Sequence, residues 1–119
     1  MSRIVSPQDI ANKVGLGAKE LSKPCEESLF PLLADFVHPW RLVFASLLNV
    51  IDLDDVESEN TGHSEQEKRI AALHRWKTRN GNRATYELLL KAVLNSGKVD
   101  CAESMCQMLL DEQGEYGLG

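Results

Sequence analysis

Hydrophobic side chains along this chain recur at spacings of three and four residues, which is the period of an α-helix and not of a β-strand. Glycine and proline residues fall between these periodic runs, where they mark turns. The pattern therefore predicts an all-α fold of short amphipathic helices joined by short loops. The expected helices span residues 28–36, 40–48, 52–59, 64–80, 84–96 and 100–112.

Short polar motifs mark where some of these helices begin. Ser28 is a candidate N-cap of the first helix. Ser64 with Glu67 three residues later has the spacing of a capping box, in which each side chain bonds the other residue's backbone. Asp100 with Glu103 repeats this spacing and is expected to cap the last helix.

The apolar positions of the later helices share one face of each helix, so they predict a single buried core. A chain of 119 residues is long enough to form one such core without disulfides or metals. The predicted core residues are Trp40, Phe44, Leu47, Leu53, Val56, Ile70, Leu73, Trp76, Leu89, Val93, Met105 and Leu109.

The two ends of the chain are expected to differ from the 28–112 domain. Residues 1–27 form an N-terminal extension, in which Ser6-Pro7-Gln8-Asp9 is a helix start, and residues 113–119 form a flexible glycine-rich tail. The extension also has the spacing of a helix-turn-helix, with 18–27 as the recognition helix of a DNA-binding protein. That reading is disfavoured because Pro24 interrupts the segment.

Charged residues change sign abruptly in the middle of the chain. From 52 to 67 every charge is acidic, and from 68 to 83 every charge is basic. Lys68, Ala72, Arg75 and Arg79 lie on one stripe of the fourth helix, which we expect to face solvent. The predicted interaction residues combine both signs: Asp52, Asp54, Asp55, Glu57, Glu59, Lys68, Arg75, Arg79 and Arg83.

Two interpretations of this charge pattern remain open. In one, an acidic third helix and a basic fourth helix form opposed patches that meet copies or similar molecules head to tail, giving salt-sensitive assembly. In the other, the acidic and basic helices pair with each other inside one molecule and make an ordinary solvated surface.

Composition favours a cytoplasmic location and argues against several functions. No apolar run approaches the length of about 20 residues that a membrane span needs, and no signal-peptide pattern opens the chain. Three cysteines without CxxC spacing fit a reducing compartment. The net charge of −5 argues against nucleic acid or an anionic membrane as the main partner.

No catalytic, metal or cofactor site is expected. No histidine lies in a Cys/His cluster of zinc spacing, which argues against a zinc site. Cys101 and Cys106 lie on a predicted core-facing helix, and no base is expected near either thiol. The chain is therefore not expected to be an enzyme.

Several motifs together resemble a known domain family. They are Trp40-x-x-Val43 with Leu47, Asp55-Val56-Glu57-x-Glu59-Asn60, the stretch from Leu73 to Thr85 followed by Leu89, and Val99-Asp100-x-Ala102-Glu103. Over about residues 28–112 the chain resembles the death domain, and it is most similar to death domains of the ankyrin type. It departs from the family pattern at Phe44, where a small residue is usual, and at Leu48-Asn49, where Leu-Gly is common. Sister folds fit less well, since the Arg-x-Asp-Leu motif of death-effector domains is absent.

The resemblance implies a six-helix antiparallel Greek-key bundle, the death fold, without cofactors or catalytic residues. It implies an adaptor that docks onto other death-domain proteins or onto itself, through oligomerisation, in apoptotic or immune-type signal transduction in the cytoplasm. It does not assign contact residues, because death-domain surfaces vary. A small helical nucleic-acid-binding protein using the 68–83 basic block is the alternative, disfavoured because neighbouring acids repel phosphate. A passive docking domain without signalling output is a further alternative.

Overall fold

The computed structural model describes residues 5–118, with side chains as far as residue 112. Within this range the chain is helical and forms no strand, which confirms the predicted all-α class. The α-helices are α1 (Pro7–Val14), α2 (Ala18–Leu21), α3 (Phe30–Leu33), α4 (Trp40–Phe44), α5 (Val50–Glu59), α6 (Glu65–Asn80), α7 (Tyr86–Asn95) and α8 (Val99–Leu118). Three short 3-10 helices complete them: η1 (Glu27–Leu29), η2 (Ala34–Phe36) and η3 (Gly81–Arg83).

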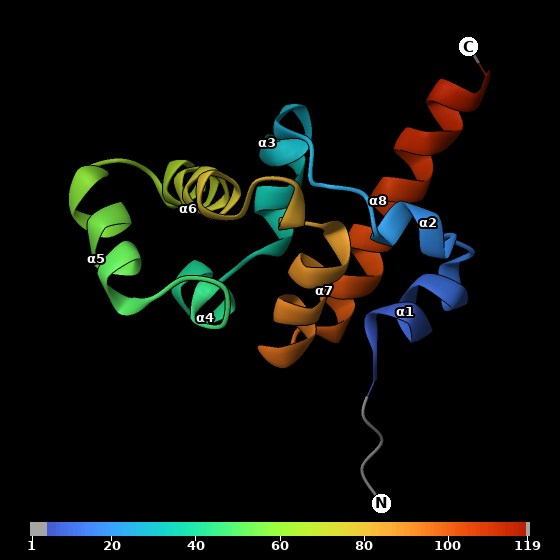
Figure 1. Cartoon of the computed structure of the whole chain (residues 1–119), viewed down its shortest axis with the longest axis horizontal. Coiled ribbons are helices and arrows are strands. Elements are labelled where there is room, and N and C mark those ends of the chain that lie inside the picture. Colours follow the sequence, from blue (N-terminus) through green and yellow to red (C-terminus); the bar gives the residue numbers. More distant parts are fainter. Residues whose placement is uncertain (1–4, 119) are drawn as a thin grey trace, which may run out of the picture.

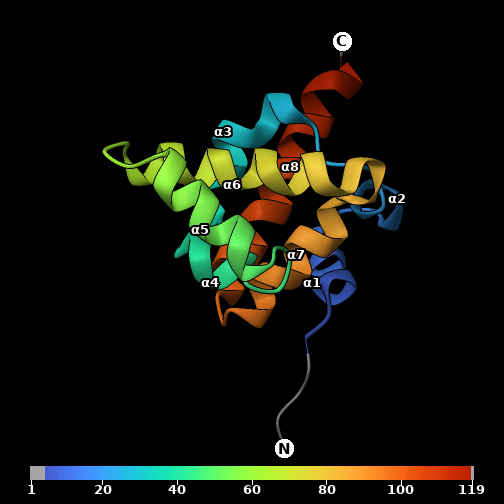
Figure 2. The same ribbon diagram turned by 60° about the vertical axis from the view of Figure 1, so that its left-hand side comes forward.

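The helices pack into one bundle in which chain-distant segments lie side by side (Figure 1). Helix α8 packs against α7 and α1, and η2 lies between α6 and α8. Helices α5 and α6 pack against each other (Figure 2), and they lie on the opposite side of the molecule from α1 (Figure 1). This arrangement brings the acidic and the basic segments of the sequence together.

The capping box that begins α6 is confirmed. The backbone N–H of Glu67 donates to Ser64 Oγ at 3.2 Å, and the backbone N–H of Ser64 donates to Glu67 Oε1 at 3.3 Å. These hydrogen bonds from the Ser64 backbone and hydroxyl lower the pKa of the Glu67 carboxyl. The same device begins α1, where Ser6 and Asp9 form a second capping box.

The other two predicted caps are wrong. Ser28 lies inside η1, which has no side-chain cap. Asp100 lies in the first turn of α8, because helical bonding already starts with the Ala102 N–H donating to the Lys98 carbonyl at 3.0 Å. Helix α5 also begins earlier than predicted, at Val50. Asn49 is its N-cap, because the backbone N–H of Asp52 donates to Asn49 Oδ1 at 2.7 Å.

The N-terminal extension packs onto the bundle. Ile10, Leu16 and Leu21 are buried, since α1 lies against α8 and α7. Helix α2 ends at Leu21, so the recognition helix 18–27 of a helix-turn-helix is not formed. Residues 1–4 of the extension lie outside the described residues.

The C-terminal helix α8 extends past the predicted end of the domain. The backbone of α8 continues to Leu118, six residues past the expected boundary at 112. The flexibility of 113–119 stays a prediction, and Gly119 lies outside the described residues.

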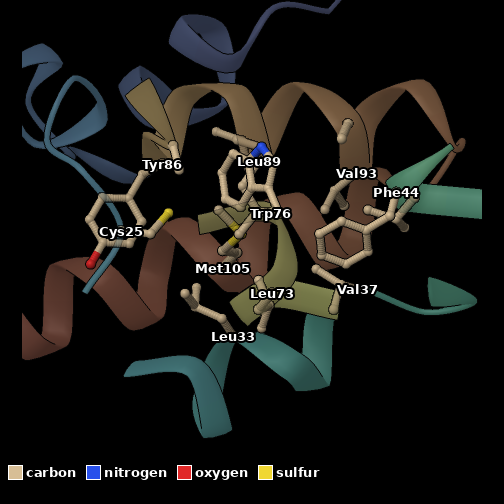
Figure 3. Packing of buried hydrophobic residues seen from close by; sticks show 14 of the residues in the cluster. Cys25, Leu33, Val37, Phe44, Leu73, Trp76, Tyr86, Leu89, Val93 and Met105 are labelled. Carbon is tan, nitrogen blue, oxygen red and sulfur yellow. The ribbon is translucent and has the colours of Figure 1, made fainter. Parts of the chain in front are cut away.

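The buried side chains form one continuous core, and Figure 3 shows its centre around Trp76. Leu47 and Ile70 are only partly buried, whereas the other predicted core residues are buried. Phe44, the departure from the death-domain pattern, is fully buried and meets Trp76 edge to face with ring centroids 6.4 Å apart. A large residue at this position is thus accommodated by an aromatic contact.

Alkaline pH is expected to destabilise the protein through three buried groups. Burial raises the pKa of Cys25 from 9.0 to about 12, the pKa of Cys106 from 9.0 to about 11, and the pKa of Tyr86 from 10.0 to about 12. The unfolded chain releases these protons first, so the stabilisation is complete below about pH 9 and is lost as pH rises towards about 12. Cys25 alone accounts for a loss of about 2–3 kcal/mol by about pH 11.

Urea unfolding at neutral and alkaline pH measures this loss. A Cys25→Ala variant is the matched control, because its free energy of unfolding should fall less between the two conditions than that of the parent protein. A free energy that stays constant from about pH 8 to about pH 11 would contradict the assignment.

Candidate interaction surface

Asp52 is the anchor of the contact between α5 and α6. Its side chain is only 3% exposed. Among the residues whose side chains are described, no other charged residue is buried. Arg79 Nη2 donates to Asp52 Oδ1 at 2.8 Å, and Arg75 Nη1 lies 3.5 Å from the same oxygen. The hydrogen bond to Asp52 raises the pKa of Arg79, so this guanidinium stays charged.

Further ion pairs extend this contact along both helices. Arg75 Nη2 donates to both oxygens of Glu59, at 2.8 and 3.0 Å, and Arg75 Nη1 lies 4.0 Å from Asp55 Oδ2. Lys68 Nζ lies 2.6 Å from Glu57 Oε2, and this hydrogen bond raises the pKa of Lys68. We call these residues the α5–α6 ion-pair cluster: Asp52, Asp55, Glu57, Glu59, Lys68, Arg75 and Arg79.

The cluster corrects the expectation that the basic stripe of α6 faces solvent. Ala72 lies on the same stripe and is fully buried, so the stripe faces α5. Lys68, Arg75 and Arg79 therefore reach carboxylates of a neighbouring helix. For Arg75 and Arg79 no acid lies within a turn on their own helix. These three cations therefore follow the second interpretation of the charge pattern, in which acidic and basic helices pair inside one molecule.

The remaining predicted interaction residues divide between paired and free. Asp54 accepts from Arg41 Nη2 at 2.8 Å, and Arg41 Nη1 also donates to the Leu53 carbonyl at 3.2 Å. Arg83 is exposed in η3 and forms no ion pair with a described residue. Opposed, unpaired patches of single sign are therefore not present on α5 and α6. A contact of these residues with a partner protein stays a prediction.

A pair of exposed aliphatic side chains at the start of α5 was missed by the sequence analysis. Val50 is 68% exposed and Ile51 is 71% exposed, although both are large and apolar. We call these two residues the apolar corner. Leu42 on the preceding helix α4 is also exposed. The signal in the sequence is Asn49: as N-cap of α5 it places the two following residues in the first turn, ahead of the inward-facing Leu53 and Val56.

The expectation that no base lies near a cysteine is wrong for Cys101. Cys25 and Cys106 are buried, but Cys101 is only half-buried in the first turn of α8. Its Sγ lies 3.6 Å from Nε2 of His38, which precedes α4. The two residues are far apart in sequence, so no spacing rule connects them.

The described residues contain no group of three or more His, Cys, Asp or Glu side chains that could hold a metal ion. No described helix combines the length and the hydrophobicity that crossing a membrane requires. No protein-family model, curated protein or solved structure matches this chain.

Proposed function

We propose that this chain is a protein–protein interaction module of the death-domain type. It docks onto further copies of itself, and by extension onto other death-domain proteins, through the apolar corner of Val50 and Ile51. By the same resemblance, the proposed setting is apoptotic or immune-type signalling in the cytoplasm.

The number and order of the helical regions support the proposed death-domain type. The segment from η1 to α8 supplies six successive helical regions, beginning at Glu27, Trp40, Val50, Glu65, Tyr86 and Val99. The two tryptophans that carry the resemblance, Trp40 and Trp76, are both buried. Each region contributes to one common core, as a six-helix bundle requires.

The apolar corner is the observation that carries the proposed docking. Single exposed hydrophobic residues are common, whereas here two consecutive aliphatic side chains are each more than two-thirds exposed. Full burial of a side chain such as Val or Ile contributes about 1.5–3 kcal/mol. Docking at this corner therefore contributes more than an exposed ion pair, which contributes about 0–1 kcal/mol.

The α5–α6 ion-pair cluster has a supporting role in this proposal. It joins α5 to α6 through Asp52 and Glu59, so the corner sits on a helix that is held in place. Because the cations are already paired, we expect association to depend only weakly on salt, in contrast to assembly through unpaired charges. Internal pairing also weakens the nucleic-acid alternative, since Lys68, Arg75 and Arg79 would have to leave carboxylates to bind phosphate.

Light scattering across a concentration series tests the proposal. The parent protein is expected to self-associate, and the Val50→Gln/Ile51→Gln variant is expected to weaken this association about tenfold or more. Glutamine keeps the net charge unchanged, so the variant isolates the loss of apolar contact area. The change should leave the fold intact because both side chains are exposed.

A Leu32→Gln/Leu88→Gln variant is the matched control. It also replaces two exposed aliphatic residues, each 41% exposed, but on α3 and α7. The control should associate like the parent protein. A parent protein that stays monomeric at high concentration, or a corner variant that associates as strongly as the control, would refute docking through this corner.

A further inference from the structure

A thiol and an imidazole face each other at the N-terminal end of α8. Cys101 Sγ lies 3.6 Å from His38 Nε2, within hydrogen-bonding reach for sulfur. With the imidazole proton on Nδ1, the Cys101 thiol donates to Nε2. This is the arrangement of a nucleophile beside a base.

The pair opens onto solvent. Cys101 and His38 are both partly exposed, and they line one pocket of about 420 Å³ together with Lys98, Val99 and Asp100. The pocket is large enough to hold a reagent of a few carbon atoms. Cys101 also lies in the first turn of α8, where backbone N–H groups favour negative charge.

We propose that Cys101 is a modification site for small soft electrophiles of the α,β-unsaturated carbonyl class, with His38 as the base. This inference does not depend on the proposed interaction function.

The addition balances without a further reactant. The S–H proton passes to His38 Nε2 while sulfur forms a bond to the β-carbon of the electrophile. The electron pair of the broken carbon–carbon π bond moves to the α-carbon, which then takes the proton back from the imidazolium. The product is a thioether, the imidazole is neutral again, and no group leaves.

The other two cysteines are internal controls. Cys25 and Cys106 are buried, no hydrogen bond joins either sulfur to a base among the described residues, and burial raises the pKa of both thiols, to about 12 and about 11. Protection of these two thiols also reports that a variant remains folded, since unfolding would expose them.

N-ethylmaleimide labelling, mapped by peptide mass spectrometry under native conditions, tests the proposal. Cys101 is expected to react about tenfold faster than free glutathione in the same solution, with Cys25 and Cys106 protected. The Cys101→Ser variant should take up no label while folded. His38→Ala should slow the reaction of Cys101 about tenfold or more.

Two further measurements separate a base from a structural role of His38. Added imidazole should restore much of the rate in His38→Ala, whereas His38→Gln, which keeps an acceptor but no base, should remain slow. An unchanged Cys101 rate in His38→Ala, or a parent rate no higher than that of glutathione, would overturn the proposal. A loss of rate that imidazole does not restore and that glutamine does restore would likewise overturn the role of His38 as a base.

Discussion

The Trp76→Ala variant is expected to lose about 3–5 kcal/mol of unfolding free energy. Trp76 is 1% exposed and lies at the centre of the core, where its ring meets Phe44 edge to face (Figure 3). Alanine removes the whole indole and leaves a cavity that the surrounding helices fill only partly. Urea unfolding followed by far-ultraviolet circular dichroism measures the loss.

Two further variants serve as controls for the stability loss of Trp76→Ala. Leu88→Ala truncates an exposed side chain on α7 and should change stability by no more than about 0.5 kcal/mol. Trp76→Phe keeps an aromatic ring and should recover part of the loss. If Trp76→Ala changed stability as little as Leu88→Ala does, the position of Trp76 in the core would be wrong.

The fold class and most of the core follow from local pattern, because helix periodicity and capping are short-range properties. Ser64 and Glu67 identify the start of α6 without any knowledge of its neighbours. Burial of Leu73 and Trp76 follows from their shared helix face. The packing of Ile10 and Leu21 could not be predicted in this way, since it depends on where a separate short helix docks.

The ion-pair cluster shows why charge patterns are harder to interpret than apolar ones. The sequence shows that Lys68, Arg75 and Arg79 share a stripe, but not which surface that stripe faces. Buried Ala72 in the same stripe is the retrospective signal, because a small residue lets a second helix approach closely. The contact between His38 and Cys101 has no sequence signal of this kind, since it joins a loop to a distant helix.

The Arg75→Ala/Arg79→Ala variant is expected to unfold at a clearly lower urea concentration than the parent protein at neutral pH. These two side chains supply the ion pairs to Asp52, whose side chain is 3% exposed and would be left without a cation. Leaving a buried charge without its partners is destabilising. The helix N-terminus offsets part of this loss, because Asp52 lies in the first turn of α5.

A triple variant tests whether the unpaired carboxylate of Asp52 causes this loss of stability. Adding Asp52→Ala to Arg75→Ala/Arg79→Ala removes the unpaired carboxylate and should restore part of the lost stability, although it truncates a third side chain. Arg83→Ala/Lys91→Ala is the matched control: it removes two positive charges from exposed residues that form no ion pair with described residues, and should be nearly neutral. Additive losses in the triple variant, or equal losses in the control, would mean that net charge and not pairing with Asp52 sets the stability of the α5–α6 contact.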